Sequence, residues 1–100
     1  MAEKQKIVLV TGGFDPLHSG HIALFQEAKK LGNKLVVGIN SDAWLTRKKG
    51  QAFMSFSERK TIIENLRMVD DIISFDDSDD TATGAIFKLM STSGYGKDII

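Results

Sequence analysis

The chain has 100 residues, with 13 basic and 13 acidic side chains, two histidines and no cysteine. This length suits one domain that buries ~60–70% of the surface of the unfolded chain, and the lack of cysteine excludes disulfide bonds and thiolate metal sites. Near the N-terminus only four consecutive apolar residues, Ile7 to Val10, follow Lys6. This run is too short for a secretory signal or a membrane span, so we expect a cytoplasmic protein that does not act at a membrane.

The charges are distributed unevenly along the chain. Residues 1–50 contain eight Lys and Arg against four Asp and Glu, whereas residues 51–100 contain five against nine. The basic residues are not massed in the pattern of a nucleic-acid-binding protein, so we expect no nucleic-acid partner. A positive N-terminal half suits a small anionic ligand.

Continuous apolar, β-branched runs alternate with amphipathic segments. We predict buried strands at residues 6–11, 34–40 and 71–75, because such runs are typical of strands covered on both faces. We predict helices at residues 20–31, 57–68 and 81–90, and a short helix after Ser41 or Asp42. Gly32 and Asn33 should end the first helix, Ser57 should cap the third, and residues 47–50 should form a basic loop.

This alternation predicts right-handed crossovers and hence an α/β, Rossmann-like parallel sheet with helices on both faces. Residues 98–100 look like the first residues of a fourth strand. We therefore interpret residues 1–100 as one domain that stops before its fourth strand is complete. In such sheets ligands bind beyond the carboxyl ends of the strands.

The segment from Thr11 to His21, with the sequence TGGFDPLHSGH, follows the first predicted strand. Gly12 and Gly13 would let the backbone approach a ligand or adopt positive φ. His21 lies in the first turn of a helix, where free N–H groups attract anions, and His18 lies three residues earlier. These groups predict a cradle for a polyphosphate, although the spacing matches neither a Walker A loop nor a dinucleotide fingerprint.

The pattern Gly-x-Phe-Asp-x-x-His-x-Gly-His, from Gly12 to His21, resembles the signature of the cytidylyltransferase-like nucleotidyltransferases. The resemblance continues through the segments 38–42, 57–60 and 69–73. It is greatest to the glycerol-3-phosphate cytidylyltransferase branch and to the adenylyltransferase domain of ADP-heptose synthesis.

The resemblance implies that CMP or AMP is transferred from a nucleoside triphosphate to a small phosphorylated alcohol or sugar, with release of pyrophosphate and with Mg²⁺ accompanying the nucleotide. It implies catalytic roles for four residues: His18, His21, Lys48 and Arg59. It places seven further residues at the nucleotide: Thr11, Gly12, Gly13, Phe14, Asp15, Gly20 and Asp42. Asp15 and Asp42 could order the loop, touch the acceptor or help to position Mg²⁺, and Phe14 should pack under the loop.

The resemblance also implies a homodimer, and a second family signature, an Ile-Ser-Thr-type segment, that would follow a fourth strand. That signature is not in these 100 residues, so we expect a fragment of a longer protein. The base, CTP or ATP, stays open.

Several alternatives stay open from the sequence. The domain could be a catalytically silent nucleotide-binding or dimerisation module, or an adenylyltransferase for a mononucleotide cofactor, although the double-histidine pattern disfavours the latter. The histidines could hold a metal ion with Asp15, Lys48 could lie in a solvated loop, and Arg59 could form an exposed salt bridge to Glu58 or Glu64. The acidic run 76–80 could bind a metal, although Asp79 or Asp80 more simply caps the next helix. Trp44 and Phe53 are expected to be packing residues.

Overall fold

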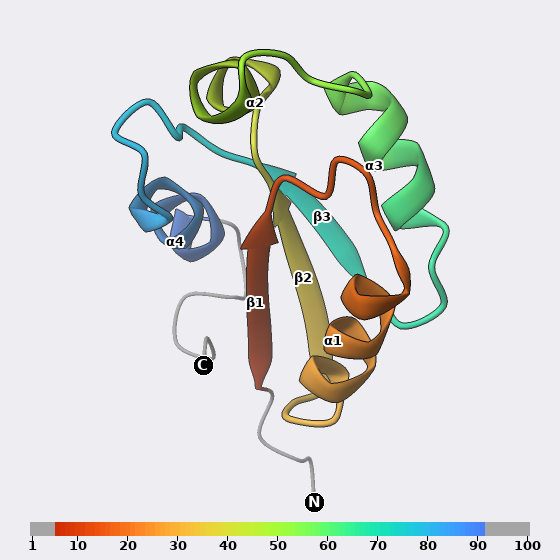
Figure 1. Cartoon of the computed structure of the whole chain (residues 1–100). Helices are drawn as coiled ribbons and strands as arrows, with labels where there is room; N and C mark the ends of the chain where they lie inside the picture. Colours follow the sequence, from red (N-terminus) through yellow and green to blue (C-terminus); the bar gives the residue numbers. More distant parts are fainter. Residues whose placement is uncertain (1–5, 92–100) are drawn as a thin grey trace, which may run out of the picture.

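The computed structural model describes residues 6–91, and its centre is a three-stranded parallel sheet (Figure 1). Strands β1 (Ile7–Gly12), β2 (Lys34–Ile39) and β3 (Asp71–Ser74) lie in the order β1-β2-β3. Ile7 pairs with Lys34 in the first ladder, and Val36 pairs with Asp71 in the second. The strands are therefore in parallel register, and their carboxyl ends meet at one edge.

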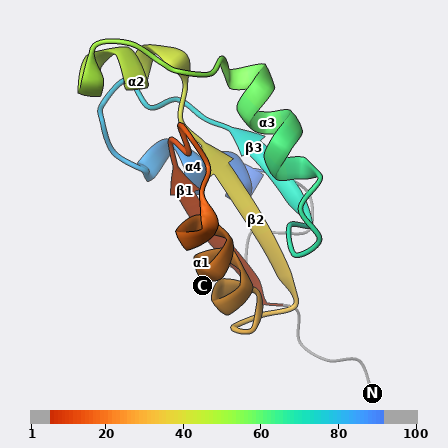
Figure 2. The ribbon, with the colours of Figure 1, turned by 45° about the vertical axis from the view of Figure 1, so that its right-hand side comes forward.

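Within residues 6–91, four helices pack around this sheet or beyond its strand ends. Helices α1 (Ser19–Lys29) and α3 (Phe56–Glu64) cover one face, and α4 (Thr83–Ser91) lies on the other (Figures 1 and 2). Helix α2 (Asp42–Lys49) lies beyond the carboxyl ends of the strands (Figure 1). The predicted fold class is thus confirmed. No helix within residues 6–91 has the length and apolar character needed to cross a membrane.

The side chains of β2 alternate between two apolar clusters. Leu35 and Ile39 belong to the cluster under α1 and α3, together with Phe25 and Ile63. Val36 belongs to the cluster under α4. These β2 side chains are fully buried, which explains why the strand reads as an unbroken apolar run. Burial of each stabilises the fold by about 1.5–3 kcal/mol.

Helix α3 differs from its predicted bounds at both ends. Its N-cap is Ser55, whose hydroxyl accepts a hydrogen bond from the N–H of Glu58 at 3.3 Å. The predicted cap, Ser57, is already helical, and the helix ends at Glu64 instead of Met68. The chain then turns through residues 65–68, and the N–H of Val69 donates a hydrogen bond to the carbonyl of Leu66.

Three other predictions need correction. Helix α1 ends at Lys29 with Lys30 as its C-cap, instead of at residue 31 before Gly32 and Asn33. Residues 47–49 are the last turn of α2 instead of a loop, and Gly50 ends this helix in the left-handed conformation, at φ 86°. Helix α4 begins at Thr83 instead of Thr81, because the hydroxyl of Thr81 accepts the N–H of Thr83 and thus precedes the helix. Residues 98–100, the predicted start of a fourth strand, lie outside the described residues.

Candidate active site

The candidate site lies where the loops after the three strands converge. The β1–α1 loop begins beside the end of β2, since the N–H of Asn40 donates to the carbonyl of Gly12 at 2.9 Å. Helix α2 and the loop that leads to α3 lie over the same edge (Figure 1). The predicted location of the site, beyond the carboxyl ends of the strands, therefore matches the position of the Thr11–His21 segment.

The two histidines stand side by side at the start of α1. Their rings stack with centroids 3.9 Å apart at an interplanar angle of 29°. Nδ1 of His18 accepts the N–H of Gly20 at 3.0 Å, and Nδ1 of His21 accepts the N–H of His18 at 3.1 Å. Each neutral ring must then carry its proton on Nε2. The pair thus presents two Nε2–H donors at the positive end of a helix dipole, which suits an anion.

Burial and the neighbouring His18 lower the pKa of His21 below its ordinary value of 6.5. The ring of His21 also contacts the edge of Phe14, with centroids 5.2 Å apart. His21 therefore favours its neutral form at pH 7.

Phe14 packs under the loop, as predicted, and it explains one of the glycines. Phe14 is 6% exposed, at φ 53°, and its ring contacts Phe25 as well as His21. A Cβ on Gly12 would lie only 2.8 Å from this ring, and a Cβ on Gly13 only 2.8 Å from Leu45. Neither glycine has positive φ. The expectation of a left-handed turn at these glycines is thus wrong, and Phe14 and Leu45 occupy the space that side chains would need. The close approach of a ligand to this backbone stays a prediction.

Gly20 is tied to the orientation of His18. A Cβ at this position would lie 2.8 Å from Cε1 and 3.0 Å from Nδ1 of His18. The absence of a side chain lets the imidazole fold back over the first turn of α1 and accept the N–H of Gly20.

Asp15 holds the loop after α2 against the motif. Its side chain is 1% exposed and accepts the N–H groups of Phe53 at 2.6 Å and Met54 at 2.8 Å. Lys49 forms an ion pair with it at 2.8 Å. Burial by itself raises the pKa of Asp15, but the Lys49 and backbone hydrogen bonds outweigh it, and the net pKa is lowered. Among the roles predicted for Asp15, these contacts support the ordering of the loop.

Arg59 is buried at the junction of three segments. It is 1% exposed, and its guanidinium donates to the carbonyls of Met54, Gly13 and Asn40 at 3.1, 2.9 and 2.7 Å. It also pairs with Asp42, at 2.6 Å. The alternative predicted for Arg59, an exposed salt bridge to Glu58 or Glu64, is thus wrong. Arg59 instead forms a buried clamp that joins the motif loop, the end of β2 and the start of α2.

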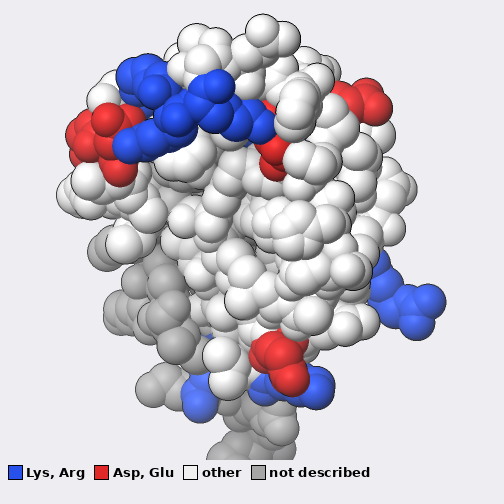
Figure 3. All heavy atoms as spheres, viewed as in Figure 1, with Lys and Arg blue, Asp and Glu red and all other residues white. Residues whose placement is uncertain are grey.

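A basic band covers the end of α2, next to an acidic patch on the β3–α4 loop (Figure 3). Arg47 pairs with Asp80 at 2.9 Å, and Lys48 lies 4.0 Å from the same carboxylate. The Lys48 side chain is 47% exposed.

A hollow of about 200 Å³ opens between α2, the end of β1 and the β3–α4 loop. Its lining combines backbone, hydroxyl, aromatic and acidic groups: Thr11, Gly12, Asn40, Trp44, Phe75, Asp80, Thr81 and Ala82. Thr11 and Gly12 therefore border this space, whereas His18 and His21 lie on the α1 side of the motif.

The structure does not assemble the predicted metal alternatives. Within residues 6–91, no three His, Cys, Asp or Glu side chains come together in a way that could hold a metal ion. Asp15 faces Lys49, and in the acidic run Asp79 accepts hydrogen bonds from Thr81 while Asp80 pairs with Arg47. Neither Asp79 nor Asp80 is bonded to an N–H within α4, so the predicted cap of this helix is corrected.

Sequence reasoning missed three residues of this region. Asp77 and Asn40 are buried polar residues that bond to each other at 3.1 Å, and Lys49 reaches Asp15. In sequence, Asp77 is one of several aspartates in a row, so no local signal distinguishes it. The expectation for Phe53 was wrong, since it is 76% exposed with Lys49 over its ring.

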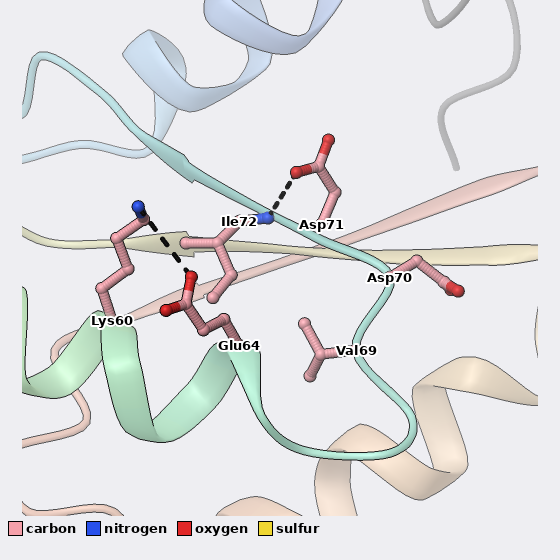
Figure 4. Close-up of a pocket in the computed structure, with 6 residues that line it drawn as sticks. All are labelled: Lys60, Glu64, Val69, Asp70, Asp71 and Ile72. Carbon is pink, nitrogen blue, oxygen red and sulfur yellow. Dashed lines mark hydrogen bonds and ion pairs between the residues drawn. The ribbon is translucent and has the colours of Figure 1, made fainter.

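A second hollow, of about 230 Å³, lies at the opposite end of β3 (Figure 4). Lys60 and Glu64 of α3 face each other across one side of it, and Asp70 and Asp71 stand at the start of the strand (Figure 4). None of the predicted site residues lines it, so the two ends of the sheet are chemically distinct.

Known proteins resemble this chain in sequence and in fold. Residues 9–90 match a family model described as cytidylyltransferase-like. The chain is 41% identical to the bifunctional protein HldE of Campylobacter concisus over 97% of the chain and 22% of that protein. It is 46% identical to glycerol-3-phosphate cytidylyltransferase of Bacillus subtilis over 68% of the chain and 53% of that protein.

A solved structure agrees with these matches. The lipopolysaccharide core biosynthesis protein of Thermoplasma volcanium superposes with a TM-score of 0.78 at 30% identity, over 87% of this chain and 70% of that one. The chain thus spans about a fifth of one curated relative and about half of the other. Because the family model matches residues 9–90, which include the Thr11–His21 motif, this chain belongs to the cytidylyltransferase-like family.

Proposed function

We propose that this chain carries the phosphate-binding half of a nucleotidyltransferase site. In the proposed reaction a phosphate oxygen of a small phosphorylated alcohol or sugar attacks the α-phosphorus of CTP or ATP. The bond between the α-phosphorus and the bridging oxygen breaks, and pyrophosphate leaves with the electron pair. No covalent enzyme intermediate is needed, so catalysis rests on positioning and on charge stabilisation.

The observation that carries this proposal is the stacked pair of histidines. Both Nδ1 atoms accept backbone N–H groups, so both Nε2–H groups are left to donate. Donors fixed in this way cost no reorganisation when charge develops on the α-phosphoryl group and the leaving group. His18 and His21 would therefore hold the triphosphate and stabilise the transition state.

We place the second substrate in the hollow of about 200 Å³ that borders the end of β1. Lys48, on α2 next to this hollow, would supply positive charge to its phosphate. Arg59 and Asp15 would act by holding the loops, since their side chains are bonded to backbone groups on neighbouring segments. Asp42 would fix the start of α2 through Arg59.

We propose Mg²⁺ as part of the metal–nucleotide substrate. The described side chains form no separate metal cluster, and the triphosphate itself offers the hard oxygen ligands that Mg²⁺ prefers. The magnesium ion would neutralise part of the phosphate charge and help to orient the leaving group.

The test is pyrophosphate release from CTP or ATP with Mg²⁺ and either glycerol 3-phosphate or a sugar 1-phosphate. We expect turnover from the wild-type protein and its loss in the His18→Ala/His21→Ala double variant. Nucleotide binding without turnover in the wild-type protein would instead support a silent nucleotide-binding module. Sedimentation of the same preparation tests the proposed homodimer.

A further inference from the structure

Asp77 is a buried carboxylate in the β3–α4 loop that reaches across to the start of α2. It is 4% exposed. Oδ2 accepts the side-chain amide of Asn40 at 3.1 Å and the N–H of Ser41 at 2.8 Å, while Oδ1 accepts the hydroxyl of Ser41 at 2.8 Å. Burial by itself raises the pKa of Asp77, but these hydrogen bonds outweigh it and lower the pKa, so the group is ionised at neutral pH.

The partners of Asp77 are themselves structural. The Ser41 hydroxyl caps α2 by accepting the N–H of Trp44 at 3.1 Å. The carbonyl of Asn40 accepts a hydrogen bond from the guanidinium of Arg59, and the backbone N–H of Asn40 donates to the carbonyl of Gly12. One carboxylate thus connects the helix cap, the end of β2 and the motif loop.

The far end of α2 is tied to the same loop. Arg47 donates to the carbonyl of Asp77 at 2.8 Å and to the carboxylate of Asp80 at 2.9 Å. Helix α2 is therefore fastened to the β3–α4 loop at its first and last turns. The hollow of about 200 Å³ lies between the two elements, with Trp44 on one side and Asp80 to Ala82 on the other.

We propose that Asp77 is a positioning residue that sets the separation of α2 from the β3–α4 loop and so determines the affinity of this hollow for the phosphorylated acceptor. This inference rests on the proposed function. Without the carboxylate, the Asn40 amide and the Ser41 N–H lose their acceptor in a buried place, which is unfavourable unless the segment moves. Such a movement would shift Trp44 and the basic end of α2, whereas the histidine pair lies on α1.

The experiment compares Asp77→Ala, Asp77→Asn and the control Asp76→Ala in steady-state assays with CTP and glycerol 3-phosphate or with ATP and a sugar 1-phosphate. Asp76 is the adjacent exposed carboxylate, and Ser78 is its hydrogen-bond partner. We expect Asp77→Ala to raise the KM for the acceptor about tenfold or more, as for the loss of a buried, charge-assisted hydrogen bond. The kcat and the KM for the nucleotide should change by less than about threefold, because the interactions that distinguish the transition state are unchanged.

Asp77→Asn should restore most of the acceptor affinity. Its amide oxygen can take the place of Oδ2, and the Ser41 hydroxyl can rotate to accept from the amide nitrogen. A folded Asp77→Ala protein with the wild-type KM for the acceptor would overturn the proposal. So would an Asp77→Asn protein as defective as Asp77→Ala, because the carboxylate would then act through its charge instead of through the position of α2.

Two further measurements keep the outcomes separate. If Asp77→Ala does not fold, Ser41→Ala removes the Ser41 hydroxyl and should raise the acceptor KM in the same way, and an unchanged KM there would contradict the proposal. If the wild-type chain shows no turnover, the proposed function fails. Hydrogen exchange then tests Asp77 alone: the Trp44 and Leu45 amides should exchange faster in Asp77→Ala than in Asp76→Ala, and equal rates would overturn the inference.

Discussion

The ring of His21 stacks on the ring of His18, and the N–H of His18 donates to Nδ1 of His21 at 3.1 Å. The backbone of one histidine thereby fixes the tautomer and orientation of the other. Two groups that lie three residues apart consequently behave as one unit with two aligned donors. Because the rings stack, substitution of either residue removes the side chain against which the other ring packs, so the effects of the two single substitutions on turnover should not add.

We expect His18→Ala and His21→Ala each to lower kcat by ~10²–10³, as for the loss of one fixed donor to a developing negative charge. The double variant should be only slightly worse than either single one, because the pair acts together. Pyrophosphate release is the measurement, and Gln26→Ala, at an exposed position on α1, is the control. A double variant within about tenfold of wild type would contradict the assignment of the pair.

Nucleotide binding should also be linked to protonation of His21. Its pKa is lowered by burial and by His18, so at pH 7 the free protein holds it neutral. A bound triphosphate places negative charge beside it and raises its pKa again. We expect wild type to take up as much as about one proton more per bound CTP than His21→Ala does near pH 6.5. Calorimetry in buffers of different ionisation enthalpy measures this difference, and equal uptake would argue against contact between His21 and the phosphates.

Gly20→Ala separates activity from stability. Alanine at a helical position is preferred to glycine by about 1 kcal/mol, so the melting temperature should stay the same or rise. The new Cβ would lie 2.8 Å from the His18 ring and force it to rotate, which should lower kcat by about tenfold to a hundredfold. Ser19→Ala, in the same turn, is the matched control. Full activity in Gly20→Ala would show that the observed orientation of His18 is not required.

The fold could be predicted because its signals are local. The run from Leu35 to Ile39 is buried on both faces and therefore reads as a strand without any knowledge of its neighbours. The start of α3 was also readable, since Ser55 and Glu58 have the spacing of a helix cap followed by an acidic residue at its third position. The prediction of Ser57 as the cap is wrong because Ser57 lacks an acidic residue three positions later.

The site could be predicted only in part. The histidines and Gly20 lie within one motif, so their relation is visible in the sequence. The clamp of Arg59 is not, because its acceptors, Gly13, Asn40 and Met54, come from three separate segments. The same holds for Gly13, whose need to be small arises from Leu45, 32 positions further along the chain.

Asp15 should contribute stability that depends on pH. Its pKa in the folded chain is below the ordinary 3.8, so the folded state favours the ionised form. This contribution is fully present above the unfolded pKa and is lost as the pH falls through the lower folded pKa. The difference in unfolding free energy between wild type and Asp15→Asn should therefore be constant above about pH 5 and shrink below about pH 3.8. Urea unfolding across this range measures it, with Glu27→Gln, an exposed carboxylate, as the control. A difference that persists unchanged at the lowest pH would contradict this account.

Arg59→Met tests whether this arginine holds the loops or grips phosphate. The substitution leaves three carbonyls and the Asp42 carboxylate without the donor that now joins them, so we expect a loss of about 3 kcal/mol of unfolding free energy. Arg59→Lys should recover little of this, because an ammonium group cannot reach acceptors arranged around a planar fork. Lys60→Met, which removes an exposed cation paired with Glu64 at 3.9 Å, is the matched control and should change stability by less than about 1 kcal/mol. Urea unfolding gives the free energies, and CTP titration of the folded variants gives the affinities. If Arg59→Met kept wild-type stability and lost only CTP affinity, the guanidinium would be a phosphate ligand first and the clamp would be secondary.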